Sequence, residues 1–100
     1  MKVVYTDEAL RDLEAIAEWL AAHYPTVAPA VEKRIRSVVS YIARFPESSR
    51  RSAGRSGVRA APLGRYPYVI FYRVAGDAIE ILYIHHTARQ RRDDDGSHKT

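Results

Sequence analysis

The stretch that decides the fold is YPYVIFYRV (residues 66–74), followed by AGD (75–77) and AIEILYIHH (78–86). Both runs are rich in β-branched and aromatic residues, and a short glycine-containing loop separates them, which predicts an antiparallel β-hairpin. Apolar residues occupy both faces of each run, whereas a sheet covered on one side alternates apolar with polar residues. The hairpin is therefore predicted to carry a second apolar face that serves as a groove for a partner. The alternative is a central hairpin that the protein itself buries on both faces.

The register of this hairpin determines which side chains share a face. We expect Val74 to pair with Ala78 across the loop. In that register the side chains of Arg73, Tyr83 and His85 point to the same side of the sheet. Histidine can act as an acid or base and arginine can stabilise a phosphorane, so this face could cleave RNA without a metal. The alternative is structural: one histidine closes the core and its neighbour hydrogen-bonds the strand end.

Upstream of the hairpin, the sequence predicts a strand, two helices and a further strand. Residues 2–5 are strand-like, and Thr6 is an N-cap for a helix whose apolar residues recur at helical spacing until Pro25. A second helix is expected from about Val27 to Phe45, then a solvated loop over residues 46–57 and a strand over 57–63. The order β-α-α-β-β-β predicts an α+β fold with a helical hairpin packed on a mainly antiparallel sheet. Residues 1–90 form one predicted domain, and residues 91–100 a polar, flexible tail.

Charge is distributed unevenly over the 100 residues. Residues 50–92 hold nine arginines against Asp77 and Glu80, a net charge of +7, whereas residues 1–49 carry −1 and residues 93–100 carry −2. A basic half of this kind predicts an acidic partner. The chain has no cysteine and no histidine pair at helical spacing, and before the polar tail it has no carboxylate–histidine pair at that spacing. We therefore expect neither a metal nor another cofactor. The acidic start and the lack of a long apolar run predict a cytoplasmic protein that does not act at a membrane.

These residues together resemble the RelE/ParE superfamily of bacterial type II toxin–antitoxin toxins. The resemblance covers residues 2 to about 90, and its motifs are V-x-Y-T-x-x-A-x-x-D-L (3–13), GVR (57–59), YVIFYRV (68–74) and IEILYIHHTAR (79–89). It implies a small growth-inhibiting toxin and a cognate antitoxin that wraps it. It also implies that operator DNA is bound only through the antitoxin.

The branches of the superfamily differ in chemistry. RelE-like members are ribosome-dependent ribonucleases with basic side chains along the central strands and an arginine directly after the strand tyrosine. Here Val69 follows Tyr68, and residues 58–63 offer one arginine and no lysine. ParE-like members, which this chain resembles at Y-x-x-F-Y-R and H-x-x-x-R, poison DNA gyrase by binding it.

We therefore expect a ParE-like, non-enzymatic toxin of a plasmid-stabilisation module, with a ParD-like antitoxin encoded by the upstream gene. One alternative is a RelE-like, metal-independent endoribonuclease acting on messenger RNA at the ribosome. The other is a non-toxic member that acts only within an antitoxin repressor complex.

The predicted site residues fall into three groups. Those expected to bind the antitoxin are Arg59, Tyr68, Ile70, Tyr72 and Arg73. Those expected to bind the target are His86, Arg89, Arg91 and Arg92. If the protein is a nuclease, the catalytic candidates are Arg59, Arg73, His85 and Arg89. Arginines inside the predicted strands are expected in buried pairs with antitoxin carboxylates, and the loop residues Arg50, Arg51 and Arg55 at the rim of that interface.

Overall fold

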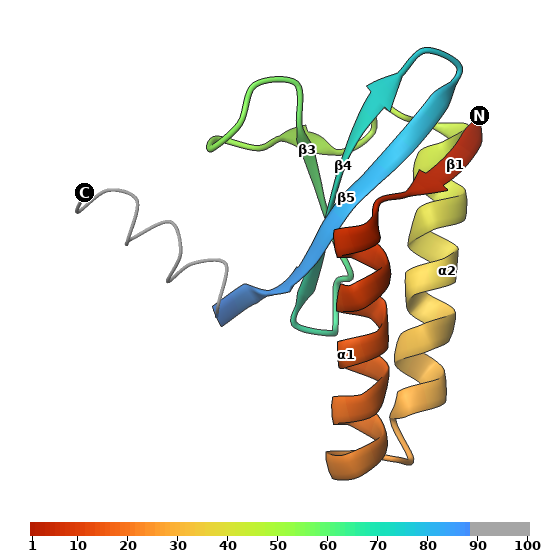
Figure 1. The fold of residues 1–100 in the computed structure, drawn as a ribbon, viewed down its shortest axis with the longest axis vertical. Helices are drawn as coiled ribbons and strands as arrows, with labels where there is room; N and C mark the ends of the chain where they lie inside the picture. The colour runs from red at the N-terminus through yellow and green to blue at the C-terminus, as the bar shows by residue number, and fades with distance from the viewer. Residues whose placement is uncertain (89–100) are drawn as a thin grey trace.

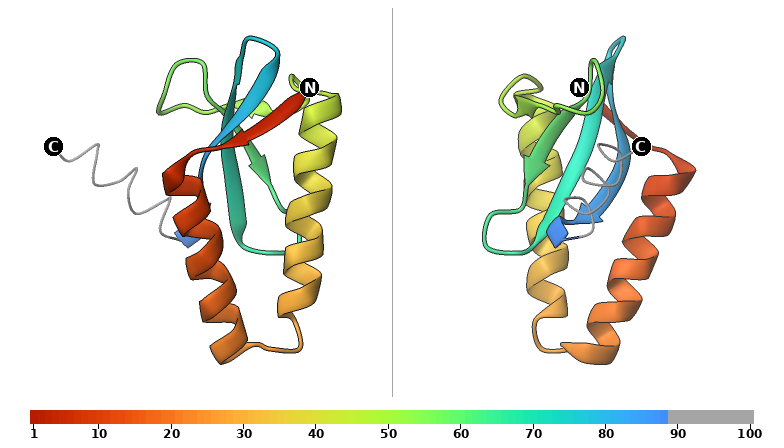
Figure 2. Two further views of the ribbon diagram at one scale, coloured as in Figure 1. Left: turned by 45° about the vertical axis from the view of Figure 1, so that its right-hand side comes forward. Right: turned by 90° about the vertical axis from the view of Figure 1, so that its left-hand side faces the viewer.

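Two helices lie on one face of a five-stranded sheet in the computed structural model, which describes residues 1–88 (Figure 1, Figure 2). The elements are β1 (Lys2–Tyr5), α1 (Asp7–His23), α2 (Ala28–Arg44), β2 (Arg50–Arg51), β3 (Arg59–Pro62), β4 (Tyr68–Ala75) and β5 (Ala78–His86). The strand order is β1-β5-β4-β3-β2, in which β1 runs parallel to β5 and the other neighbouring pairs are antiparallel. The predicted α+β fold is confirmed. The segment predicted as a solvated loop also contains the short strand β2.

Some of the expected features lie beyond the described part of the chain. Arg89, Arg91 and Arg92 lie outside residues 1–88, as does the predicted tail over residues 91–100. Within the described residues, neither helix is long and apolar enough to cross a membrane.

The helices form where the sequence supplies a start signal and an apolar stripe. The Thr6 hydroxyl accepts a hydrogen bond from the Ala9 amide at 3.0 Å. Two acidic residues in the first turn of α1 stabilise the helix by interacting with the positive end of its dipole. Proline in the first turn of α2 has no amide to leave unpaired. The stripe that α2 buries against the sheet consists of Val31, Ile35, Val39 and Ile42.

Apolar side chains fill both faces of the sheet, as predicted. The main core lies between the helices and the sheet and includes Ile70, Tyr72 and Ile81, all with no exposed surface. A smaller cluster on the other face, here called the outer face, consists of Val58, Val69, Phe71 and Leu82, with Ala60 and Tyr83 packed against it. Its four central members are at most 8% exposed, so the protein itself buries them. The expected open apolar groove on this face is therefore wrong, and the alternative of a hairpin buried on both faces is confirmed.

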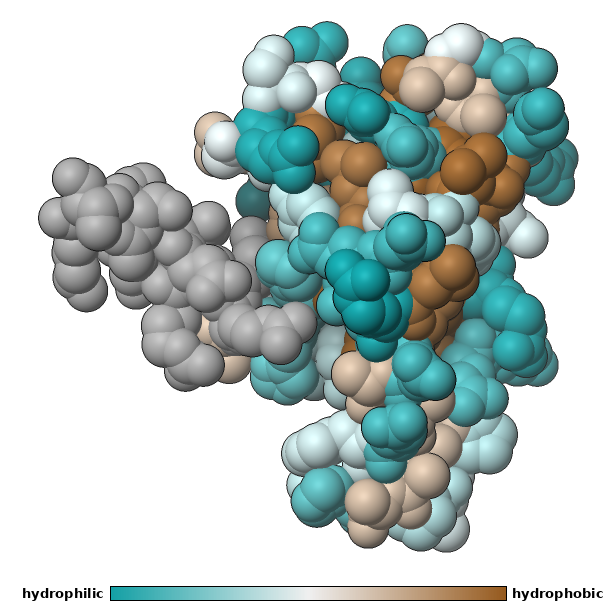
Figure 3. Space-filling model, in the orientation of Figure 1, coloured by the Kyte–Doolittle hydropathy of each residue, from teal (hydrophilic) through white to brown (hydrophobic). Residues whose placement is uncertain are grey.

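The exposed apolar surface lies mainly on the helices and on β1 instead. Figure 3 shows hydrophobic surface over β1 and β5 and between the two helices. Large apolar side chains that are about half exposed include Leu10, Trp19, Tyr24, Tyr41 and Phe45. These residues extend from α1 through the interhelical turn to the end of α2, so the unpartnered apolar area belongs chiefly to the helical layer.

The hairpin register differs from the expected one by one residue. Ala75 pairs with Ala78, so Val74 lies opposite Ile79. Gly76 takes a φ of 63° at the first position of a two-residue loop, as in a type II′ turn, which shortens the expected loop. A β-bulge between Phe71 and Tyr72 then shifts the pairing again.

The bulge decides which side chains of β5 face outward. Tyr72 lies opposite Ile81 but Phe71 lies opposite Tyr83, so Leu82 is the extra residue, and Leu82 and Tyr83 both pack on the outer face. Because the bulge shifts the pairing by one residue, Tyr83 and His85 share the outer face with Phe71. The predicted grouping of Arg73, Tyr83 and His85 on one face is therefore confirmed, although the predicted register was wrong.

Candidate functional site

The outer face of the central strands carries a cluster of aromatic and basic side chains. The rings of Tyr83 and His85 stack with centroids 4.6 Å apart, and the Phe71 ring lies 4.9 Å from Tyr83. Arg55, from the segment between β2 and β3, places its guanidinium 5.7 Å from the Tyr83 ring and donates a hydrogen bond to the Tyr83 hydroxyl at 3.4 Å. The chain thus presents the cation of Arg55 and the partly exposed rings of Tyr83 and His85 on one side of the sheet, over the buried ring of Phe71.

Arg73 shares this face but does not reach His85. It pairs with Glu80 across the hairpin at 2.8 Å, and its side chain is 50% exposed. His85 lies opposite Val69, four residues along β4 from Arg73, a separation of about 13 Å at the rise of a β-strand. The predicted combination of His85 with Arg73 as acid–base group and phosphate-stabilising cation is therefore not formed here. Arg73 is exposed in the free toxin, so the expectation that it forms a buried pair with an antitoxin carboxylate stays a prediction.

Arg59 lies on the opposite side of the sheet. It is in register with Tyr72, and side chains of directly opposed residues share a face. Its guanidinium donates to the carbonyl oxygens of Ser49 at 2.7 Å and Glu47 at 3.5 Å, while the Tyr72 hydroxyl donates to the Pro46 carbonyl at 2.7 Å. Both side chains thus hold the turn that follows α2. Three of the four proposed nuclease residues, Arg59, Arg73 and His85, lie within the described residues, and the structure does not bring them together. The fourth, Arg89, lies outside the described residues.

Three residues expected to contact the antitoxin are core residues. Tyr68, Ile70 and Tyr72 face the helices and are 6%, 0% and 0% exposed. The sequence predicted that these three side chains share one face of β4, but it did not predict that the helices cover this face. In this conformation Ile70 and Tyr72 have no surface to offer a partner, so their assignment to the antitoxin interface is withdrawn. Tyr68 keeps a small exposed part that lines a cleft beside α1, and its assignment stays a prediction. Arg59 and Arg73 retain partly exposed side chains.

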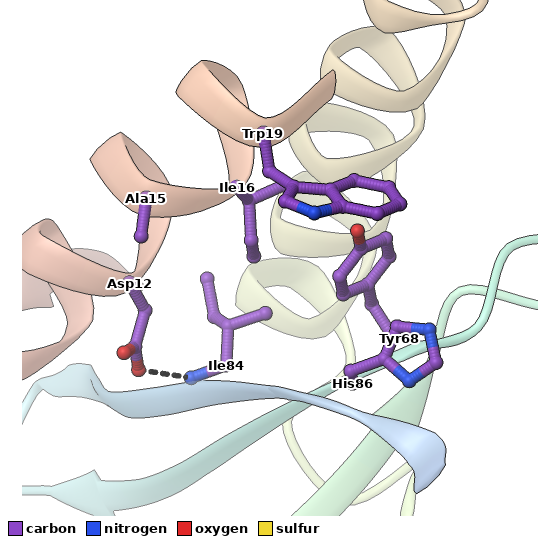
Figure 4. Close-up of a pocket in the computed structure, with 7 residues that line it drawn as sticks. All are labelled: Asp12, Ala15, Ile16, Trp19, Tyr68, Ile84 and His86. Atoms are coloured by element: carbon purple, nitrogen blue, oxygen red, sulfur yellow. Dashed lines mark hydrogen bonds between the residues drawn. The ribbon is translucent and has the colours of Figure 1, made fainter. Parts of the chain in front are cut away.

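His86 lines a cleft between α1 and the end of the hairpin (Figure 4). This cleft, here called the α1 cleft, has a volume of about 330 Å³ and is lined by Asp12, Ala15, Ile16, Trp19, Tyr68, Ile84 and His86. His86 meets the Tyr68 ring edge-on at 5.3 Å, and burial raises the pKa of Tyr68 above its ordinary value. The Asp12 carboxylate accepts a hydrogen bond from the Ile84 amide at 2.8 Å. The α1 cleft is thus suited to binding an apolar side chain rather than to catalysis.

Sequence reasoning placed Arg55 at the rim of the antitoxin interface but not over Tyr83, and it assigned no role to Trp19 or Asp12. Arg55 lies in a polar loop whose path over the sheet depends on the β2–β3 pairing. Trp19 is 48% exposed and stacks on His23. Asp12 had one signal, its place in the V-x-Y-T-x-x-A-x-x-D-L pattern, which the structure explains by its bond to β5.

The comparisons with known proteins agree with this fold. Residues 3–91 match the family described as the ParE toxin of the type II toxin–antitoxin system parDE. Toxin RelE2 of Caulobacter vibrioides is 34% identical over 89 residues, which are 88% of this chain and 97% of that protein. Toxin RelE3 of the same organism is 30% identical over 83 residues, covering 83% of this chain and 90% of that protein.

Solved structures show the same architecture. A chain of the chromosomal ParDE system from P. aeruginosa superimposes with a TM-score of 0.76 at 28% identity, over 86% of this chain and 95% of that chain. A chain of the RelB–RelE antitoxin–toxin complex from Methanococcus jannaschii superimposes with a TM-score of 0.59 at 19% identity, over 91% and 95% of the two chains. The second likeness concerns the fold alone. From the family match over residues 3–91 and relatives that span most of its length, the chain belongs to the ParE toxin family, within the RelE/ParE superfamily of type II toxin–antitoxin toxins.

Proposed function

We propose that this toxin acts by binding DNA gyrase and is neutralised by direct binding of a ParD-like antitoxin encoded by the upstream gene, in a plasmid-stabilisation module. The match to the parDE toxin family and the 28% identity to a chain of a solved ParDE system support this assignment over a RelE-like nuclease. Both proposed partners are cytoplasmic, and we place the toxin there too.

The observation that carries the proposal is the separation of the cationic side chains. Cleavage of a phosphodiester without a metal needs preorganised cations close to the acid and base that move the protons. Arg59 is committed to two loop carbonyls on the helical face, and Arg73 pairs with Glu80 on the outer face, about 13 Å from His85. A toxin that acts by binding requires only an exposed surface, which this arrangement provides.

The proposed antitoxin interface combines charge with apolar area. Residues 50–92 carry a net charge of +7, and Arg50, Arg51, Arg55 and Arg73 are exposed. The half-exposed apolar side chains of the helical layer would be covered in the same complex. We therefore expect an antitoxin with an acidic and amphipathic toxin-binding segment. His86 is proposed to contact the target, as are Arg89, Arg91 and Arg92, which lie outside the described residues.

Induced expression in a host with and without the upstream gene tests the proposal. We expect growth arrest with filamentation and a DNA-damage response, and purified toxin should trap gyrase in cleaved complexes with DNA. Co-expression of the antitoxin should abolish both effects. Codon-position cleavage of messages with intact supercoiling would contradict the gyrase mechanism and support the ribonuclease. Unchanged growth would contradict it in favour of a non-toxic repressor subunit.

A further inference from the structure

Two carboxylates of α1 and one histidine of β5 converge beside the sheet. Glu8 and Asp12 lie four residues apart and therefore on the same face of the helix. Together with His85 they offer three ligand atoms that all lie within 4.8 Å of one another. Spacing along the sequence does not indicate this cluster, because the histidine comes from a strand more than seventy residues away from the two carboxylates.

Two of the three side chains are held in place by groups outside the cluster. One oxygen of Asp12, Oδ2, accepts a hydrogen bond from the Ile84 amide at 2.8 Å, which leaves Oδ1 free to bind another group (Figure 4). The His85 ring stacks on Tyr83 at 4.6 Å and lies 5.7 Å from Phe71. Partners of this kind orient ligands before an ion arrives, as second-shell groups do in metal sites.

The charges of the cluster are not balanced by the protein. Among the described residues the one ion pair is Arg73–Glu80, so neither carboxylate pairs with His85 or with a lysine or arginine. Like charges four residues apart on a helix repel each other. The helix dipole accounts for an acid in the first turn, where Glu8 lies, but its effect falls off before Asp12. A cation between the three groups would remove the repulsion.

We propose that Glu8, Asp12 and His85 bind one divalent transition-metal ion, with Zn²⁺ as its representative. Imidazole nitrogen with carboxylate oxygen is a donor set that suits zinc, whereas magnesium and calcium take oxygen ligands. Three protein ligands leave a further coordination position for water or another donor. Bonds of about 2.0–2.2 Å require the ligand atoms to close by roughly 1 Å. The Glu8 side chain is exposed and can rotate to provide that movement.

The bound ion would join α1 to the last strand. β1 pairs with β5 only as far as Ile81, so the following residues of β5 have α1 as their neighbour on that edge. An ion held by both elements binds the folded state alone, so it should raise the melting temperature as its concentration increases. This inference is independent of the toxin's target, because it predicts metal binding and stability rather than growth arrest.

The test is a calorimetric titration of the full chain, stripped with EDTA, against ZnCl₂. We expect saturable binding of one ion per chain. Glu8→Gln, Asp12→Asn and His85→Gln should each weaken it by at least about tenfold, the scale on which loss of even a supporting group acts. The matched controls are Glu14→Gln, an exposed acid on another face of α1, and His86→Gln, which points to the opposite side of β5. Both controls should bind zinc as the unmodified chain does.

Structural damage is separable from loss of a ligand. Asn at position 12 keeps an oxygen that can accept from the Ile84 amide, and Glu8 is exposed, so these variants should fold as judged by circular dichroism in EDTA. Cobalt substitution provides a second readout, since the visible absorption of bound Co²⁺ should be lost in His85→Gln and kept in His86→Gln. Absence of saturable zinc binding by the unmodified chain, or binding that survives in Glu8→Gln and His85→Gln alike, would overturn the proposal.

Discussion

At the scale of single residues, Gly64 shows how the absence of a side chain permits a contact. Gly64 follows β3 with a φ of 80°, a conformation that other residues rarely adopt. Arg34 of α2 donates from Nε to the Leu63 carbonyl at 2.8 Å, which places its guanidinium beside the glycine. A Cβ added at Gly64 would lie 2.9 Å from Nη2 of Arg34. The helix and the sheet therefore approach each other here because the residue is glycine.

We expect Gly64→Ala to lower the free energy of unfolding by about 1–2 kcal/mol through its backbone conformation, plus up to about 1 kcal/mol as Arg34 gives up its hydrogen bond. Gly76→Ala is the matched control, since Gly76 has a φ of 63° but nothing within 4 Å of an added Cβ. Urea unfolding measures both changes. In an Arg34→Met background the difference between the two glycine sites should disappear. A difference that persists there would show that Arg34 is not its cause.

Two tyrosines make stability sensitive to alkaline pH. Burial raises the pKa of Tyr5 and of Tyr68 above the ordinary phenolic value. Above about pH 10 the unfolded chain ionises these phenols while the folded chain keeps them protonated, so the free energy of unfolding falls with rising pH up to the folded pKa. Below about pH 10 this contribution is fully present. Urea midpoints across this range should decline, and less steeply in a Tyr5→Phe, Tyr68→Phe double variant. An equal decline in both proteins would contradict the assignment.

At the scale of elements, α1 replaces the strand that β5 lacks on one edge. Beyond Ile81, the Thr6 hydroxyl donates to the Leu82 carbonyl at 2.7 Å and Asp12 accepts from the Ile84 amide at 2.8 Å. Ala9, fully buried between these contacts, lets the helix lie against the strand. The threonine, alanine and aspartate of the V-x-Y-T-x-x-A-x-x-D-L pattern thus form one seam between helix and sheet.

Thr6→Val should separate the start of α1 from β5. The variant loses both the cap to the Ala9 amide and the bond to Leu82, and we expect it to lower the free energy of unfolding by about 1–3 kcal/mol. Thr6→Ser keeps the hydroxyl and should stay within about 0.5 kcal/mol of the unmodified chain. Hydrogen exchange should accelerate at the Ala9 amide in the valine variant while α2 remains protected. Equal losses for valine and serine would mean that the methyl group, and not the hydroxyl, supports the seam.

At the scale of the whole molecule, Arg50, Arg51, Arg55 and Arg73 are exposed. They belong to a stretch, residues 50–92, with a net charge of +7, whereas residues 1–49 carry −1. Arg73 belongs to this exposed set because half of its side chain is accessible. Rim charges mainly change the association rate and its dependence on salt, whereas buried pairs change dissociation. Because Glu80 already pairs with Arg73 in the free toxin, we now propose that Arg73 acts as a charge of the first class.

Association with the antitoxin should slow in Arg50→Ala, Arg55→Ala and Arg73→Ala, and the loss should shrink as salt rises and screens the surface charges. Arg36→Ala is the matched control, because it removes the same charge from the exposed side of α2. Stopped-flow binding at low and high salt measures both effects. If Arg36→Ala slowed association as much as the three variants do, total charge and not this surface would steer the antitoxin.

Features with local causes could be predicted from the sequence. The order of elements, the central hairpin and the apolar character of both its faces follow from periodicity, capping and turn residues within a few positions of each other. The motifs indicated the superfamily for the same reason, since they are read along the chain. For the site, the sharing of one face by Arg73, Tyr83 and His85 was predicted.

What only the tertiary structure decided depends on contacts between distant segments. The bulge at Leu82 and the face that the helices cover determine that Tyr72 is a core residue and that Arg59 points away from Arg73. The parallel pairing of β1 with β5 brings α1 to the strand edge, and with it Glu8 and Asp12 to His85. A shift of one residue in a strand exchanges its two faces, and no local pattern reports which pairing packs the core best. The sequence by itself therefore determined the family and its elements, and long-range packing determined which side chains meet.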